Sequence, residues 1–215
     1  MAAAPAVKVI LPTELKLAPA AINPFLSQAK DLFHNHGLSI AGEIYEFTEL
    51  EFYWYAAAHP DPYVHCHPEQ QARGKWYFHR PTHTSPTYKG GTFKGLDLTW
   101  GDSTTYFGVL IRSIYHPRTG AISGPCNVVD HILKSYQVDS IATLVGEHGP
   151  LSVHANERKL CLVPAKSDPS LPMYLGPRVG LSTKDINYQA KEYRFVRRYT
   201  DQPKLKAKRT LRLLN

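Results

Sequence analysis

The chain has 215 residues, of which 43% are hydrophobic and 11% aromatic, and its 25 lysines and arginines exceed its 18 aspartates and glutamates by seven charges. This composition supplies one packed core and excludes a disordered chain, and no apolar run is long enough to cross a membrane. The first residues do not form a secretory signal and the three cysteines make no disulfide framework, so we expect a protein that is not secreted but intracellular, nuclear or cytoplasmic.

The first predicted element is a helix over residues 23–36. Asn23 is a suitable N-cap, Pro24 suits the first helical turn, and Gly37 is expected to end the helix. The next segment, EIYEFTELEFYWY (43–55), is dense in aromatic residues and is predicted to be a strand.

Two glutamates share one face of this predicted strand. Alternation places Glu49 and Glu51 on the side of Phe47 and Tyr53, with Cβ atoms roughly 6.5–7 Å apart. Two carboxylates this close among aromatic rings cannot both ionise at low cost, so the pair contains a candidate general base for activating water. The alternative is a pair of solvated glutamates on an edge strand.

Residues 56–92 are rich in proline, histidine and glycine, and they are predicted to form long loops around one short strand, GKWYFHR (74–80). Their histidine spacing matches no compact zinc template, so no metal is predicted, and stacking on a ligand or bonding to a phosphate is the preferred role. The histidines concerned are His59, His65, His67, His79 and His83.

The loop YKGGTFKGLD (88–97) places lysines and aromatic rings among glycines, a pattern that suits contact with phosphates and bases. It contains no Walker or dinucleotide-binding pattern, so no cofactor is predicted. The remaining predicted elements are strands over 93–100, 106–115, 160–165 and 192–199 and a helix over 127–137. Strands dominate without regular βαβ alternation, so we expect an α+β fold, a single domain with a curved, mostly antiparallel sheet and a few flanking helices.

Positive charge gathers near the end of the chain. Residues 191–212 contain nine lysines and arginines and only two acidic residues, a difference of seven that equals the net charge of the whole chain. This density predicts a surface that binds phosphates, and the alternative is a solvated terminal strand with a basic tail. The predicted organisation is a flexible segment (1–20), one domain (21–200) and a basic tail (201–215).

The order of these segments resembles the alkyladenine (3-methyladenine, methylpurine) DNA glycosylases of the single-domain kind. GEIYEFTELEFY (42–53) is similar to the family strand G-x-I-V-E-T-E-A-Y, which carries the catalytic glutamate, and GVLIRSI (108–114) is similar to V-L-L-R-A-L. GPCNVVDHIL (124–133) resembles the G-P-x-x-L helix start, and two later segments resemble R-V-G-V and L-R-F-Y, namely GPRVGL (176–181) and EYRFVRRY (192–199). The likeness covers most of the chain in the same order.

The resemblance implies base excision by a monomer that flips a damaged nucleotide out of duplex DNA, with a glutamate-activated water attacking C1′ of the sugar. By motif position Glu49 is the catalytic base and Arg112 stands on the family's arginine. The residues expected at the substrate pocket are Glu51, Tyr53, His65, Tyr77, Phe93 and Asp97. Those expected to bind DNA are Lys89, Lys94, Arg178, Arg194, Arg197, Arg198, Lys208 and Arg209.

Three positions depart from the family pattern. Glu51 replaces a pocket tyrosine, Asp97 stands near a pocket asparagine, and KGGTFKG (89–95) lacks the tyrosine that wedges into DNA. We therefore expect Glu51 to accept a hydrogen bond from the base. Two other functions stay open: a non-catalytic nucleic-acid-binding module on the same fold, and a hydrolase of small modified nucleosides or a metal-dependent enzyme that uses the histidine loop.

Overall fold

The computed structural model describes residues 23–148, 152–153 and 160–214, and the predicted flexible segment 1–20 lies outside them. The helices are α1 (Leu26–Asn35), α2 (Pro125–Ser135), α3 (Ile141–His148) and α4 (Ile186–Ala190). The strands are β1 (His36–Ile40), β2 (Glu43–Ala56), β3 (His59–Pro60), β4 (Trp76–Phe78), β5 (Leu96–Thr99), β6 (Tyr106–His116), β7 (Gly120–Ser123), β8 (Cys161–Pro164), β9 (Tyr174–Gly176), β10 (Arg194–Val196) and β11 (Arg212–Leu213).

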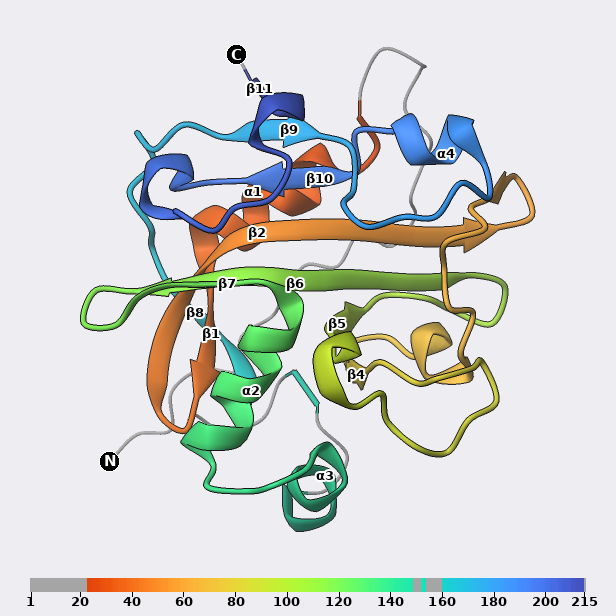
Figure 1. The fold of residues 1–215 in the computed structure, drawn as a ribbon, viewed down its shortest axis with the longest axis horizontal. Helices are drawn as coiled ribbons and strands as arrows, with labels where there is room; N and C mark the ends of the chain where they lie inside the picture. Colours follow the sequence, from red (N-terminus) through yellow and green to blue (C-terminus); the bar gives the residue numbers. More distant parts are fainter. Residues whose placement is uncertain (1–22, 149–151, 154–159, 215) are drawn as a thin grey trace.

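The strands form one open sheet, with β2 and β6 across its middle (Figure 1). Its main path runs β11-β9-β10-β2-β6-β5-β4, while β1 joins β2 to β8, β3 pairs with β2, and β7 pairs with β6. Every strand pair within the described residues is antiparallel. The predicted α+β domain with a mostly antiparallel sheet is therefore confirmed.

Strand β2 is buried on both faces, as its aromatic composition indicates. Leu50, Phe52 and Trp54 join the hydrophobic core on one side. Because side chains alternate along a strand, Glu49 and Glu51 point to the other side, where they are 2% and 0% exposed. The sheet therefore carries two carboxylates in its interior, and these carboxylates need partners.

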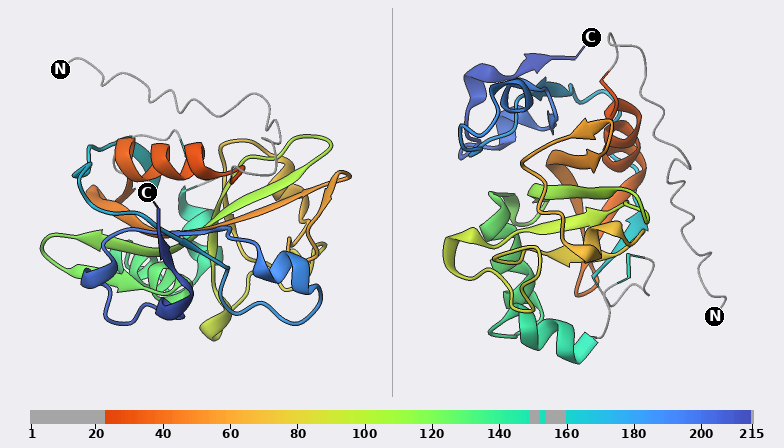
Figure 2. Two further views of the ribbon diagram at one scale, coloured as in Figure 1. Left: turned by 90° about the horizontal axis from the view of Figure 1, so that it is seen from above. Right: turned by 90° about the vertical axis from the view of Figure 1, so that its right-hand side faces the viewer.

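Helices α1 and α2 cover opposite faces of the sheet, as Figure 2 shows from above. Phe25, which precedes α1, stacks on Phe52 and Phe107 with ring centroids 5.0 Å and 5.6 Å apart. Helix α2 begins two residues earlier than predicted, and its predicted apolar stripe is buried as expected: Val128, Val129, Ile132 and Leu133.

The predicted ends of the first helix are wrong. Asn23 lies in a turn before α1, where its side chain accepts a hydrogen bond from the Phe25 amide. Gly37 does not end the helix but lies in β1. Strand β1 passes so close to β2 at this point that a Cβ on Gly37 would lie 2.8 Å from Cγ2 of Ile44. The glycine therefore serves strand packing rather than helix termination.

The segment expected to be a basic tail is part of the fold. Strand β11 pairs with β9, and Gln202 and Leu205 are buried. The Gln202 amide donates to the carbonyls of Thr48 and Arg197, so it connects this segment to β2 and to the residue that follows β10. The predicted boundary at residue 200 is therefore wrong for residues 201–214.

Candidate active site

The site begins at an irregularity in the centre of the sheet. The register between β2 and β6 shifts on both sides of Glu49, between Phe47 and Glu49 and again between Glu49 and Leu50. Such bulges turn a side chain away from its regular direction and are frequent next to active sites. Here the bulge lies at Glu49, whose buried carboxylate is on the face that α2 covers.

Three donors hold the Glu49 carboxylate. Arg112 Nε and Arg194 Nε both donate to Oε1 at 2.8 Å, and Ser113 Oγ donates to Oε2 at 2.8 Å. The carboxylate is buried as expected, but it is not left without a charged partner, because two guanidinium groups contact it. Glu49 is thus held in one orientation.

Glu51 is fully engaged inside the protein. Its Oε1 accepts from the Val179 amide at 2.7 Å, and its Oε2 accepts from Tyr53 Oη at 2.8 Å and from Arg112 Nη1 at 3.4 Å. The expectation that Glu51 accepts a hydrogen bond from a base is therefore wrong, because both of its oxygens already accept hydrogen bonds within the protein. Glu51 instead positions Tyr53 and Arg112.

The charges of this cluster reinforce one another. Burial opposes the charge of Arg112, but Glu51 and Glu49 outweigh it and raise the pKa of the guanidinium. Burial, and then the charge of Glu51, raise the pKa of Tyr53 well above its usual range. Arg112 is consequently a permanent cation and Tyr53 a permanent hydrogen-bond donor at any working pH.

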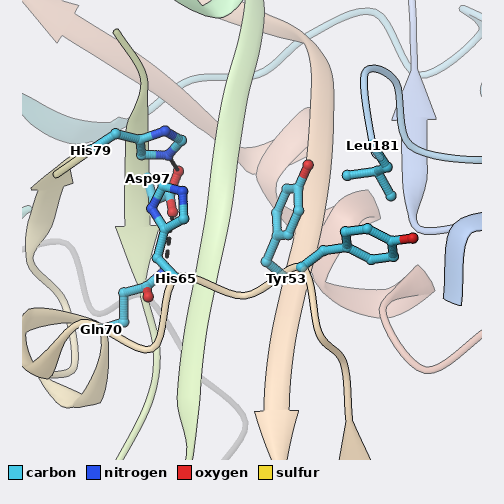
Figure 3. A pocket seen from close by; sticks show the side chains of 7 residues that line it. Tyr53, His65, Gln70, His79, Asp97 and Leu181 are labelled. Atoms are coloured by element: carbon cyan, nitrogen blue, oxygen red, sulfur yellow. Dashed lines mark hydrogen bonds and ion pairs between the residues drawn. The ribbon is translucent and has the colours of Figure 1, made fainter. Parts of the chain in front are cut away.

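A small inner pocket lies beside this cluster (Figure 3). It has a volume of about 140 Å³. Its lining residues come from β2, from β5 and from the surrounding connecting segments: Tyr53, Tyr63, His65, Gln70, His79, Asp97 and Leu181. Of the predicted pocket residues, the structure brings Tyr53, His65 and Asp97 together here.

His65 is a neutral member of the inner pocket. Burial, helped by nearby cationic groups, lowers its pKa to about 3. Its Nδ1 lies 3.3 Å from Tyr77 Oη, and its Nε2 lies 3.4 Å from Lys89 Nζ. Tyr77 is fully buried behind His65, so it supports the pocket rather than lining it.

A larger outer cavity of about 570 Å³ lies next to the inner pocket, and His79 lines both. Glu49 and Arg112 lie in its wall, and Phe93, which is 74% exposed, lies at its edge. The remaining lining residues come from the 92–94 loop, the start of α2 and two later loops: Thr92, Lys94, Ser123, Gly124, Pro125, Cys126, Asn127, Val179, Gly180, Lys204 and Lys206.

Three arginines expected to bind DNA are interior residues, which corrects that expectation. Arg194 and Arg197 are 0% and 2% exposed. Arg194 holds Glu49, and Arg197 donates to the Phe33 carbonyl at the end of α1. Arg178 forms a wholly buried ion pair with Asp61.

The other predicted DNA-binding cations differ in their availability. Arg198 is half-buried and bidentate on Glu46, and Lys94 is paired with Asp130. Lys89 contacts His65, and burial lowers its pKa. Lys208 is half-buried and Arg209 is exposed.

Several residues of the site were missed by sequence reasoning. Tyr63 and Leu181 come from loops and Gln70 from a short 3-10 helix (Pro68–Gln71), and no local pattern marks them. His79 was named among the histidines expected to contact a ligand but not among the expected pocket residues, although it alternates with Tyr77 in the segment GKWYFHR and so shares its side of the chain.

Among the residues that the structure describes, no three histidines, cysteines, aspartates or glutamates are grouped so as to hold a metal ion. In the same residues no helix has the length and apolar composition to cross a membrane.

Comparison with known proteins gives one informative similarity. No family model matches the chain. The chain is 39% identical over 186 residues to the uncharacterized protein L759 of Acanthamoeba polyphaga mimivirus, a match that covers 80% of this chain and 85% of the viral protein.

Proposed function

The chain belongs to the same family as the mimivirus protein L759, and we propose that it excises modified bases from duplex DNA by hydrolysing the N-glycosidic bond. The observation that carries this proposal is Glu49, a buried and oriented carboxylate in the wall of the outer cavity. A buried carboxylate that is held in place next to a substrate-sized space is suited to activating water.

The inner pocket supports a flat ligand with polar edges. Tyr53, Tyr63 and His65 supply ring faces, and Asp97 and Gln70 supply hydrogen-bonding groups. A nucleobase that is turned out of the duplex needs this combination of stacking and edge contacts. The sugar would then lie in the outer cavity, close to Glu49.

In the proposed reaction a water molecule attacks C1′ and gives a proton to the Glu49 carboxylate. The C1′–N bond breaks, its electron pair leaves with the base, and the sugar keeps the oxygen of the water. Arg112 and Arg194 act as positioning residues, because they hold Glu49 Oε1 from two sides at 2.8 Å.

The outer cavity also supports a polyanionic substrate. Lys204 and Lys206 are exposed on its wall, and α2 begins there at Pro125. Lysines and the positive end of a helix dipole both favour phosphate groups. These cations replace the buried arginines as the proposed contacts with the DNA backbone.

The proposal is tested by incubating the protein with duplexes that each carry one modified base and scoring abasic sites. We expect release of at least one base, and the Glu49→Gln variant should lose at least about 10²-fold of that rate while still binding the duplex. Glu147→Gln, an exposed glutamate on α3, is the matched control and should keep full activity. Thermal unfolding of both variants shows whether the fold survives.

A non-catalytic nucleic-acid-binding module is the second candidate, and one observation favours it. Glu49 already accepts three hydrogen bonds, as structural carboxylates do. Duplex binding that weakens with salt, without release of any base from the whole set, would establish this function and exclude base excision.

A further inference from the structure

His79 lies where the two cavities meet. Its ring lines the inner pocket together with Tyr53 and His65, and it lines the outer cavity together with Glu49. Figure 3 shows it beside Asp97 at one end of the pocket, across from Tyr53. A group on His79 can therefore reach a ligand that occupies both spaces.

A buried carboxylate orients this histidine. His79 Nε2 lies 2.7 Å from Asp97 Oδ1, and Gln70 Nε2 donates to Asp97 Oδ2 at 3.3 Å. Asp97 is only 2% exposed. His79 Nδ1 makes no hydrogen bond with the described part of the chain, so it is free to face a ligand.

Two glycines make room for the pair. A Cβ on Gly95 would lie 2.6 Å from both Nδ1 and Cε1 of His79 and 3.0 Å from Cγ, which places it against the face of the ring. A Cβ on Gly108 would lie 2.4 Å from Asp97 Oδ2. Both positions therefore depend on the absence of a side chain.

The other ionisable groups around His79 are less suited to deliver a proton. His65, with its ring centroid 4.5 Å away, is neutral because burial lowers its pKa to about 3. Burial raises the pKa of Tyr77, and Lys89 lies beyond His65. The charged groups that line the outer cavity with His79 are Glu49, Arg112, Lys94, Lys204 and Lys206.

We propose that His79, oriented by Asp97, is the proton donor to the leaving base, and that the site acts on bases that carry no positive charge in the duplex. This inference rests on the proposed function. As the C1′–N bond breaks, its electron pair moves onto the base and the His79 proton moves to a base nitrogen. The proton that Glu49 takes from water balances the proton that His79 gives up.

The aromatic rings of the inner pocket agree with an uncharged base. The guanidinium carbon of Arg178 lies 4.5 Å from the ring centroid of Tyr53 and 5.5 Å from that of Tyr63. A cationic base gains much of its stacking energy from the negative face of a ring. Arg178 already occupies that attraction at Tyr53 and Tyr63, so less of it is left for a cationic base, whereas a neutral base does not depend on it.

The test compares two classes of leaving base in duplex DNA. Hypoxanthine and 1,N6-ethenoadenine are neutral and need a proton to leave, whereas 7-methylguanine is already cationic and does not. We expect His79→Gln to slow release of the neutral bases by about 10²–10⁴-fold and to leave release of any cationic base nearly unchanged. His116→Gln, a histidine that also faces a carboxylate but lies outside both cavities, is the matched control.

The pH profile gives an independent readout. The rate at which the wild type releases a neutral base should fall as the pH rises, because His79 loses its proton. This fall in rate at high pH should be absent in His79→Gln. Asp97→Asn should slow release of neutral bases, because the carboxylate that orients the His79 ring is gone.

The outcomes separate the two proposals. Full activity of His79→Gln on neutral bases, or release of 7-methylguanine alone by the wild type, overturns the role of His79 and leaves the proposed function standing. Release of no base from any duplex by the wild type overturns the proposed function, and the role of His79 with it.

Discussion

Arg178 and Asp61 form an ion pair in which neither side chain has any exposed surface, with Nη1 and Oδ2 2.7 Å apart. Arg178 also donates to the carbonyls of Phe52 in β2 and Tyr188 in α4. One residue therefore fastens the segment that carries Leu181, a residue of the inner pocket, to the central strand. Removing one partner of such a pair leaves the other charge buried and uncompensated.

For this buried ion pair we predict that Arg178→Met lowers the free energy of unfolding by about 3–5 kcal/mol. Urea denaturation measures the change. Arg118→Met removes the exposed ion pair with Glu43 and should leave the free energy of unfolding nearly unchanged. The double variant Arg178→Met with Asp61→Asn should recover part of the lost free energy of unfolding. Equal losses for Arg118→Met and Arg178→Met would contradict the structural role given to the buried ion pair.

The loop between β4 and β5 supports the candidate proton donor at the scale of an element. The His79 amide donates to the Gly95 carbonyl, and the Lys89 amide donates to the His79 carbonyl. Hydrogen bonds from two parts of the loop therefore fix the backbone of His79. Gly95 then lies flat against the imidazole ring. The loop that the sequence marks as glycine-rich therefore has a packing role at Gly95.

We accordingly predict that Gly95→Ala displaces the His79 ring, because its Cβ would lie 2.6 Å from two ring atoms. Release of neutral bases should fall towards the level of His79→Gln, while duplex binding is kept. Gly90→Ala is the matched control, since a Cβ there meets nothing within 4 Å and its φ of −104° suits alanine. Unchanged base release by Gly95→Ala would show that the position of the His79 ring does not matter for releasing neutral bases.

The distribution of charge is a property of the whole molecule. The net charge of +7 comes from the last part of the chain, but the fold moves Arg194 and Arg197 into the interior. Lys204 and Lys206 stay exposed in the outer cavity. The outer cavity beside Glu49 therefore presents exposed cations, whereas Lys30 lies on α1, which covers the opposite face of the sheet from α2.

From this distribution of charge we predict that the exposed lysines of the outer cavity determine part of the salt dependence of duplex binding. Replacing Lys204 and Lys206 by glutamine should reduce the slope of log K against log salt concentration by up to about 0.9 for each lost phosphate contact. Replacing the exposed Lys30 and Lys166, which lie beside α1, should leave the slope unchanged. An equal effect of both double variants would indicate a diffuse charge effect instead of a defined surface.

Local patterns determined the long elements of this protein. The alternation and aromatic density of β2 and β6 and the apolar stripe of α2 are each carried by consecutive residues, and all three elements form close to the predicted positions. Strands β1, β9 and β11 were not predicted, because each is short and exists through its pairing with distant strands. The same pairing turns the expected tail into part of the sheet.

The sequence by itself also placed Glu49 and Glu51 on one face, because alternation along a strand needs no knowledge of other segments. Only the tertiary structure decided what surrounds them. Arg194, which holds Glu49, lies 145 residues further along the chain, and nothing local distinguishes it from the exposed Arg209. Whether an arginine meets phosphate or an internal carboxylate depends on which strands become neighbours, and contacts between distant segments set that.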